Sequence, residues 1–475
     1  MSDNRHFDHL VEKGNPIGEV AAVNDFLVKV SGMQPVNVRS LVMFEDGSKG
    51  YVTEVGDQLT NVLHLGTESL SLGMRAVVQH DNLVTKVGKE FLGRVVNVFG
   101  EPLDGKGPIA AESTWPVFND APPLSERFGL SDQLATGVSV IDGLLPLIKG
   151  QRLAILGDSK SGKTALATQI ATNQAGSDEV VIYVLISKRR TDISNLLLRL
   201  EKSNAMQNSI VVVATSFDSL TASYLAPYVG CALGEYLWQK CDRDVIIVYD
   251  DLTSHAHVYR QVALLSRMSP GRDSYPGDMF YAHSSLLERA GRLKSNQRTL
   301  TAIPIVLADS GDIAAYLPTN IMSITDGQWI LDMKVFRDTM RPAVNVGLSV
   351  SRVGGVGQNQ RQKELTAEAL KLLADYAEAE EYSHFGSELA LQAQSSLARG
   401  KMLFTLMNQA IDEHHSILGQ TLALDIVLHA PLDKPIDVQK LKKLAEEEGK
   451  AVKTKEDYEK VKAKLTKESL VELKK

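Results

Sequence analysis

The pattern of hydrophobic and polar positions changes twice along the chain. Up to about residue 85, short runs rich in β-branched and apolar residues alternate with turn residues, including Asn24-Asp25 and Asp46-Gly47. The clearest runs are Ile17–Val23, Phe26–Val30, Ser40–Phe44 and Tyr51–Val55. Short strands joined by tight turns are typical of a small antiparallel barrel or sandwich. We therefore expect residues 1–85 to form an N-terminal antiparallel β-barrel domain.

From about residue 86, longer apolar runs alternate with helical patterns. These runs are Arg152–Leu156, Glu179–Ile186, Ser209–Ala214 and Asp244–Tyr249. Strands this apolar are buried on both faces, which is typical of a mostly parallel sheet covered by helices. The pattern predicts a central α/β domain over residues 86–356.

Strand patterns are missing after about residue 357. Leu365, Ala369, Leu372 and Tyr376 lie at helical spacing on one face, which predicts a C-terminal α-helical domain over residues 357–475. Its tail is rich in Lys and Glu, with a thin apolar stripe formed by Tyr458, Val461 and Leu465. A solvated helix and a helix that docks a partner are both consistent with this tail.

Composition narrows the class of protein. The 475 residues include 51 Lys and Arg against 58 Asp and Glu, a formal net charge of −7. A mildly acidic chain lacks the positive field of a non-specific nucleic-acid binder, so we expect no nucleic-acid partner. Two cysteines, Cys231 and Cys241, make no disulfide framework. The polar start of the chain does not resemble a signal peptide, and no apolar run reaches the length of a membrane-spanning helix.

One segment carries a complete phosphate-binding pattern. The residues are Gly157, Asp158, Ser159, Lys160, Ser161, Gly162, Lys163 and Thr164, which match G-x-x-x-x-G-K-[ST] between an apolar run and a helical one. In such a loop the backbone N–H groups surround the phosphates at a helix N-terminus. Lys163 would neutralise phosphate charge and the Thr164 hydroxyl would ligate Mg²⁺. The alternative is a chance match in a glycine-rich turn. The apolar run before the loop and the helical pattern after it argue against this alternative.

A second acidic motif follows the buried run 245–249. Asp250 lies where a strand-end carboxylate can hold a magnesium-bound water, and the alternative role for an Asp here is a helix cap. We predict the magnesium role for Asp250 and leave a capping role to Asp251.

Several long stretches resemble the α-subunit family of F-type ATP synthases. Besides the phosphate loop, they are residues 92–108, 249–252, 270–278, 316–328, 346–354 and 385–389. The resemblance runs from about residue 17 to about residue 430, with the stretches in the family's order. It implies the family's barrel, nucleotide-binding and helical domains.

The resemblance also implies the complex in which the chain would act. The α subunits alternate with β subunits in a hexamer around a central shaft, the γ subunit, and bind Mg²⁺ with ATP or ADP without hydrolysing it. The complex synthesises or hydrolyses ATP while protons flow through other subunits. The chain would thus lie peripherally on the cytoplasmic face of a bacterial membrane. Residues 1–16 are short for the arm that docks the δ-type stator subunit, so that partner is left open.

The position that decides catalysis is filled by Lys188. Catalytic β relatives carry a Glu here to activate water, and α subunits usually carry Gln. A protonated lysine attracts phosphate but is a poor base, so we interpret this chain's own site as non-catalytic. Asp192 is the rival carboxylate.

The resemblance assigns a role at a neighbouring site to the segment Ser349–Arg352. Arg352 matches the family's arginine finger, which stabilises charge on the β subunit's γ-phosphate. Without the resemblance, an arginine in an intrachain ion pair would be the ordinary interpretation. Ser349 matches a position that is also associated with activity.

Three further residues match family positions in the adenine pocket: Phe336, Arg341 and Gln409. Core packing is the alternative for Phe336. A second glutamine of the family falls on Ile411 and is missing, and Ser159-Lys160 replace the usual Arg-Gln of the loop.

Three other functions compete with this interpretation. A self-sufficient hexameric ATPase would need a carboxylate at Lys188. An RNA-tracking hexameric helicase would need aromatic and basic residues in the barrel, where residues 17–85 have few aromatics. A head subunit of an atypical F-type-like ATPase that drives something other than a proton channel fits the same residues.

Overall fold

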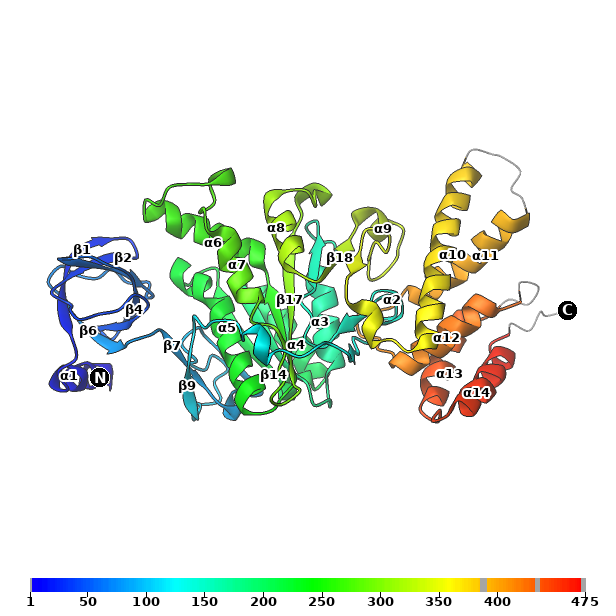
Figure 1. Cartoon of the computed structure of the whole chain (residues 1–475), viewed down its shortest axis with the longest axis horizontal. Helices are drawn as coiled ribbons and strands as arrows, with labels where there is room; N and C mark the ends of the chain where they lie inside the picture. The colour runs from blue at the N-terminus through cyan, green and yellow to red at the C-terminus, as the bar shows by residue number, and fades with distance from the viewer. Residues whose placement is uncertain (1, 385–390, 432–435, 471–475) are drawn as a thin grey trace. The chain divides into compact units, whose positions relative to one another are not determined.

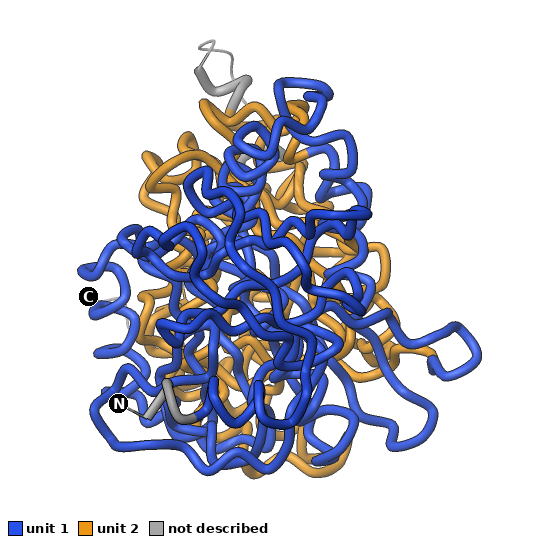
Figure 2. Tube along the Cα trace, turned by 90° about the vertical axis from the view of Figure 1, so that its left-hand side faces the viewer, with its two compact units in different colours: residues 1–128, 176–306, 319–324 blue, residues 129–175, 307–318, 325–475 orange. Residues whose placement is uncertain are grey.

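The computed structural model describes residues 2–384, 391–431 and 436–470. They form two compact units, which Figure 2 colours separately. Unit 1 comprises residues 1–128, 176–306 and 319–324, and unit 2 comprises residues 129–175, 307–318 and 325–475. The stretch 385–389 that contributed to the resemblance lies outside the described residues.

The N-terminal part of unit 1 is a closed six-stranded barrel, as the strand pattern predicts (Figure 1). Its strands are β1 (Ile17–Asn24), β2 (Leu27–Ser31), β3 (Leu41–Phe44), β4 (Lys49–Val55), β5 (Leu59–His64) and β6 (Arg75–His80). Every pairing is antiparallel, in the order β1-β2-β5-β4-β3-β6, and β6 closes onto β1. Alternate side chains such as Val42 and Phe44 fill the interior, as the two-residue period of a strand requires.

A helix that the strand pattern did not predict precedes the barrel. It is α1 (Ser2–Glu12), and Figure 1 shows it beside β6. Its Phe7 and Leu10 are buried against Met43 and Val77 of the barrel wall. Met43 points outward between the inward Val42 and Phe44, so β3 is buried on both faces.

The α/β part of unit 1 has a parallel sheet in the order β17-β15-β13-β14-β8. The strands are β8 (Arg94–Val96), β13 (Val180–Lys188), β14 (Ser209–Thr215), β15 (Val245–Asp250) and β17 (Thr299–Leu307), with β16 (Gly291–Arg292) antiparallel to β17. The helices are α4 (Arg190–Lys202), α5 (Leu220–Lys240), α6 (Leu252–Leu265) and α7 (Met279–Leu287). A two-stranded antiparallel sheet of β7 (Val84–Val87) and β9 (Ser113–Pro116) packs on α5. Because helices cover β13, its first seven residues are all buried.

Unit 2 contains the phosphate loop and the C-terminal helices. Its strands and short helices are β10 (Gln133–Leu134), α2 (Ser139–Leu144), β11 (Leu147–Ile148), β12 (Ala154–Gly157), α3 (Lys163–Asn173), β18 (Gly327–Leu331), α9 (Met333–Arg337) and β19 (Val350–Ser351). Strand β12 pairs parallel with β18, which pairs antiparallel with β19. Helix α8 (Tyr316–Ile324) spans the change from unit 2 to unit 1.

The C-terminal region is helical, as predicted. Its helices are α10 (Gln360–His384), α11 (Leu391–Met407), α12 (Ile417–His429), α13 (Val438–Gly449) and α14 (Lys455–Glu468). The apolar stripe of the tail packs within the chain itself. Leu465 is inaccessible, Tyr458 and Val461 are half-buried, and the Tyr458 hydroxyl and Lys462 ammonium bind Asp425 of α12 at 2.9 and 2.6 Å. The tail helix is therefore packed on this face, and its other face is exposed.

Candidate functional site

The phosphate loop of unit 2 joins β12 to α3, the context that its motif requires. Gly162 caps α3 with φ of +100°, a left-handed conformation that favours glycine. Gly157 is needed for a different reason: a Cβ there would lie 2.6 Å from the Leu331 carbonyl oxygen. The Lys163 ammonium donates to the carbonyl oxygens of Gly157 and Asp158 at 2.9 and 2.7 Å. The loop thus has the turn, the helix N-terminus and the cation that phosphate binding needs.

Most of the remaining loop residues are accessible to solvent. Ser159, Lys160 and Thr164 are exposed, whereas Ser161 is buried below Gly157. Lys160 takes a positive φ of 60°. An exposed lysine beside Lys163 places two cationic side chains on this loop, which increases its attraction for polyphosphates.

The residues predicted for the adenine pocket lie together in unit 2. The guanidinium carbon of Arg341 lies 3.4 Å from the centre of the half-buried Phe336 ring, and Arg341 donates to the Phe336 carbonyl oxygen at 2.7 Å. Gln409 donates its backbone N–H to the Arg341 carbonyl oxygen at 2.7 Å. The pair of a ring and a stacked guanidinium is a flat surface suited to a base.

Gln409 itself is buried, and its side-chain amide has partners within the chain. Its Oε1 accepts from the Ser139 N–H at 2.9 Å, and its Nε2 donates to the carbonyl oxygens of Gly137 and Glu413 at 2.6 and 2.5 Å. Gln169 of α3 donates to the same segment, at the Glu413 carbonyl oxygen. These bonds tie the segment after α11 to the helix that the phosphate loop begins. Gln409 therefore positions this segment, and its contact with a base stays a prediction.

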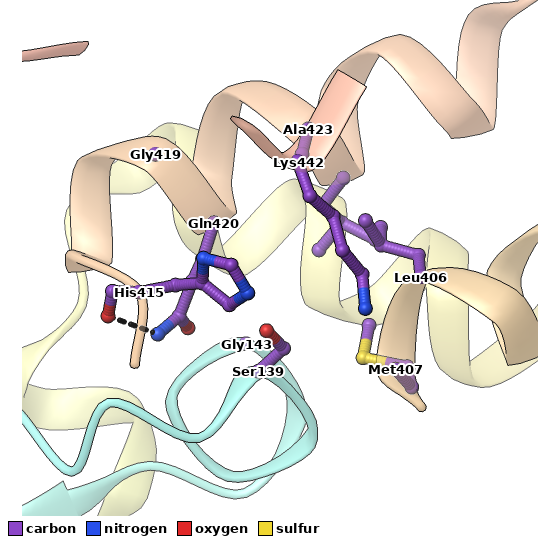
Figure 3. A pocket seen from close by; sticks show the side chains of 10 residues that line it. Ser139, Gly143, Leu406, Met407, His415, Gly419, Gln420, Ala423 and Lys442 are labelled. Atoms are coloured by element: carbon purple, nitrogen blue, oxygen red, sulfur yellow. Dashed lines mark hydrogen bonds between the residues drawn. The ribbon is translucent and has the colours of Figure 1, made fainter. Parts of the chain in front are cut away.

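A small cavity lies beside this segment. Its lining includes Ser139, Met407, His415, Gln420 and Lys442, which Figure 3 shows around it. Its volume of about 10 Å³ holds about one water molecule, far less than a purine base occupies. Lys442 donates to the Asn408 carbonyl oxygen at 2.5 Å, and burial lowers the pKa of this lysine. This cavity is therefore part of the core and does not bind nucleotide.

The segment predicted to carry an arginine finger has a well-defined backbone. Arg352 donates its N–H to the Asp326 carbonyl oxygen at 2.9 Å, and the Asp326 carboxylate holds Arg152 by two bonds of 2.8 and 3.1 Å. The Ser349 hydroxyl is buried, accepts from the Ile330 N–H at 2.9 Å and donates to the Asn345 carbonyl oxygen at 2.7 Å. Ser349 is thus a structural anchor of this segment.

The Arg352 side chain is exposed. Within the described ranges 2–384, 391–431 and 436–470, no acidic side chain forms an ion pair with it. The ordinary alternative for this residue, an intrachain ion pair, is therefore not the arrangement found. A rigid backbone with a solvent-facing guanidinium is the arrangement that a finger directed at another chain needs.

Lys188 forms a charge cluster with two aspartates at the end of the unit 1 sheet. Its ammonium lies 2.6 Å from Asp250 Oδ1 and 2.7 Å from Asp251 Oδ2. Burial by itself lowers the pKa of Lys188, but the two carboxylates outweigh burial and raise this pKa well above its ordinary value. Lys188 is therefore firmly protonated and cannot serve as a general base.

Both aspartates have additional partners. Asp250 is 1% exposed, and its Oδ2 accepts from the Tyr183 hydroxyl at 3.2 Å. Asp251 caps α6, as predicted, by accepting from the Ser254 N–H at 2.6 Å. Burial tends to raise the pKa of Asp251, but Lys188 and the Ser254 N–H outweigh this and lower it. The rival carboxylate, Asp192, is bound at the surface to Arg189 at 3.0 Å.

The role of Asp250 as a magnesium ligand stays a prediction. Its Oδ1 is paired with the Lys188 ammonium and its Oδ2 accepts from the Tyr183 hydroxyl, so a cation would share these oxygens with partners within the chain. Across the described residues, no three His, Cys, Asp or Glu side chains are placed to hold a metal ion. The sequence motif did not reveal that Lys188 is the partner of Asp250.

Comparisons with known proteins agree with the resemblance. Residues 137–351 match the nucleotide-binding domain of the ATP synthase alpha/beta family, and residues 358–474 match the C-terminal domain of the ATP synthase alpha/beta chain. The chain belongs to the ATP synthase alpha/beta family.

Within this family the chain is similar to alpha subunits. It is 41% identical over 407 residues to ATP synthase subunit alpha of Nitrosomonas europaea, covering 83% of this chain and 79% of the relative. It is 39% identical over 438 residues to subunit alpha of Thiobacillus denitrificans, with 89% and 85% covered, and 40% identical over 430 residues to subunit alpha of Dehalococcoides mccartyi strain BAV1, with 90% and 85% covered. No helix in the described part of the chain is long and apolar enough to cross a membrane.

Proposed function

We propose that this chain is the non-catalytic, nucleotide-binding alpha subunit of a rotary F-type ATP synthase or ATPase. In that complex it alternates with β subunits in a hexamer around a γ shaft and binds ATP or ADP at its own phosphate loop. Proton flow takes place in other subunits, and the head lies peripherally on the cytoplasmic face of the membrane. The domain boundaries at residues 85/86 and 356/357 belong to this proposal.

The observation that carries the non-catalytic role is the pairing of Lys188. Hydrolysis needs a group that orients or deprotonates the attacking water, and a carboxylate is the usual one. Here that position holds an ammonium bound to Asp250 and Asp251. Both carboxylates at this strand end are thus paired with the same ammonium, and we infer that neither acts as the base.

The finger role is supported by Arg352. Its backbone is fixed by Asp326 and its side chain is exposed, so its guanidinium is available to another subunit. There it would stabilise charge on the transferred phosphoryl group, an effect on the order of 10³–10⁵ in rate for arginine fingers. Ser349 contributes by holding the segment in place.

The test is reconstitution with the β and γ subunits of the same organism. Arg352→Ala should lower ATP hydrolysis by about 10³-fold or more while the isolated variant binds nucleotide as the wild type does. Arg352→Lys should recover little, because lysine lacks the planar fork of donors. Arg267→Ala, an exposed arginine in unit 1, is the matched control and should change neither quantity.

Two results would refute the proposal. If the Arg352→Ala complex hydrolysed ATP at the wild-type rate, Arg352 would not be an arginine finger. Steady hydrolysis by the isolated wild-type chain, at a rate comparable to the complex, would remove the non-catalytic assignment.

A further inference from the structure

Within unit 2, the phosphate loop and the stacked pair of Phe336 and Arg341 follow the carboxyl ends of two neighbouring strands. Strands β12 and β18 are parallel, and their register pairs Gly157, where the loop begins, with Leu331. A Cβ at Gly162, the last glycine of the loop, would lie 3.7 Å from Leu331 Cδ2, so Leu331 lies beside both ends of the loop. Helix α9, which carries Phe336, begins two residues after Leu331. The ring is therefore placed next to the loop by the β12–β18 pair.

A second set of contacts leads from Arg341 back to the loop. Gln409 donates its backbone N–H to the Arg341 carbonyl oxygen at 2.7 Å. In the same segment, the carbonyl oxygens of Ala410 and Glu413 accept from Gln169 Nε2 at 3.2 and 2.9 Å. Gln169 lies on α3, six residues after the start of this helix at the phosphate loop. That is about 9 Å along the helix, a length that a nucleotide spans between its phosphates and its base.

The stacked pair offers a base a flat face. The Arg341 guanidinium carbon lies 3.4 Å from the centre of the Phe336 ring, and its Nη1 donates to the carbonyl oxygens of Phe336 and Met340 at 2.7 and 2.8 Å. Stacking tolerates any base, because every base has a π-face. A base stacked on the guanidinium lies parallel to it, and the N–H donors of the guanidinium point within its own plane. Stacking here therefore adds affinity without selecting adenine.

Selection between purines requires contact with the base edge. Adenine presents an amino donor where guanine presents a carbonyl acceptor. Gln409 is 2% exposed, and its side-chain amide is already bonded: Oε1 accepts from the Ser139 N–H at 2.9 Å, and Nε2 donates to the carbonyl oxygens of Gly137 and Glu413 at 2.6 and 2.5 Å. Turning this amide towards a base would leave buried groups of the chain unpaired, which is unfavourable.

The residues beside Gln409 do not supply the missing selection. Ala410 and Ile411 have apolar side chains. The Oδ1 of the exposed Asn408 accepts from the Arg341 N–H at 3.0 Å. The Nδ2 group of Asn408 is a donor, and both purines present acceptors to a donor. Side chains of the segment 408–411 are thus unsuited to telling adenine from guanine.

We propose that this chain binds purine nucleoside di- and triphosphates without distinguishing adenine from guanine. The inference rests on the proposed nucleotide-binding function and names the class of nucleotide. The phosphates are held by the loop 157–164, and the base stacks on Phe336 and Arg341. Gln409 supports Arg341 through its backbone, while its side-chain amide stays bonded within the chain.

The experiment measures ATP and GTP binding to the isolated full-length chain by calorimetry in excess MgCl₂. For the wild type, the two dissociation constants should agree within about threefold. A site that reads the base edge through hydrogen bonds would instead favour one of the two by at least about tenfold, because the wrong base leaves a buried polar group unpaired.

Three variants make the result specific. Phe336→Leu keeps an apolar side chain but loses the π-face, and should weaken ATP and GTP binding equally, by about tenfold. Phe336→Trp restores an aromatic face and should bind both nucleotides at least as tightly as the wild type. Phe128→Leu is the matched control, since the Phe128 ring lies 5.3 Å from the Arg292 guanidinium in unit 1, and should change neither affinity. Tripolyphosphate, which has no base, should bind the wild type and Phe336→Leu equally.

The outcomes separate the inference from the function on which it rests. A preference of tenfold or more for either nucleotide would overturn the inference and leave the nucleotide site intact. Unchanged binding of both nucleotides by Phe336→Leu would also overturn it, because the base would then not stack on this pair. Failure of the wild type to bind ATP and GTP would overturn the proposed function and the inference with it. If Phe336→Leu does not fold, the comparison of ATP with GTP on the wild type still decides.

Discussion

A buried ion pair in unit 1 gives the sharpest stability prediction. Glu235 of α5 and Arg289, after α7, are 0% and 1% exposed and joined by two bonds of 2.7 and 2.6 Å. Glu235 Oε2 also accepts from Trp115 Nε1 and Asn119 Nδ2, both at 3.1 Å, and Arg289 donates to the Val117 carbonyl oxygen at 2.9 Å. Burial tends to lower the pKa of Arg289, but its neighbours raise it well above its ordinary value.

Glu235→Gln keeps the size of the side chain and removes its charge. The guanidinium of Arg289 then stays buried without a counterion, and breaking a buried pair in this way costs about 3–5 kcal/mol. A cooperative unit of this size loses about 2 °C in melting temperature for each kcal/mol. We therefore expect the transition of unit 1 to fall by roughly 6–10 °C.

The measurement is differential scanning calorimetry together with urea unfolding followed by circular dichroism. Asp192→Asn is the matched control. The side chains of Asp192 and Arg189 are 41% and 78% exposed, so this ion pair should contribute less than about 1 kcal/mol to the free energy of unfolding. Replacing both buried partners, Glu235→Leu with Arg289→Met, should cost clearly less than Glu235→Gln alone, because no unpaired charge remains. A Glu235→Gln protein within about 1 kcal/mol of the wild type would refute this reasoning.

Three further predictions concern other parts of the chain. His255 and His283 are buried with their rings hydrogen-bonded at 3.1 Å, and burial lowers the pKa of His255 to about 4, so the folded state favours its neutral form. The free energy of unfolding should therefore decline as pH falls from about 6.5 towards 4. Thermal unfolding measured across this pH range should show a smaller decline for His255→Gln. Phe7→Ala should detach α1 from the barrel, costing about 3–5 kcal/mol locally and exposing residues 2–12 to limited proteolysis. Asp425→Asn should speed hydrogen exchange in α14, because the carboxylate that binds Lys462 at 2.6 Å is lost; unchanged exchange there would contradict this account.

The elements that the sequence predicted well are those set by local chemistry. The turns at Asn24-Asp25 and Asp46-Gly47 connect β1 to β2 and β3 to β4, because short polar residues and glycine accept the backbone angles of tight turns. The phosphate loop was equally clear, since a strand, a loop and a helix follow each other without a gap. Here the sequence neighbours are also the structural neighbours.

The features that the sequence did not reveal depend on distant partners. Glu235 lies in a mostly apolar helix, and its partner Arg289 is 54 residues away, so no local pattern marks the pair. The sequence left the tail open between a solvated helix and a helix that docks a partner, because it does not show that Lys462 reaches Asp425. The apolar face of α1 was likewise unrecognised, since its partner surface exists only once the barrel has closed.

Lys188 shows the same limit at the candidate site. Resemblance to a family locates the position, and the residue type says that no carboxylate stands there, but neither says what the ammonium binds. An ammonium facing phosphate would strengthen nucleotide binding directly, whereas the ammonium found here is held by one oxygen each of Asp250 and Asp251. The chemistry of this site is therefore decided by a pairing across two strands, 62 and 63 residues apart in the sequence, and not by the residue type alone.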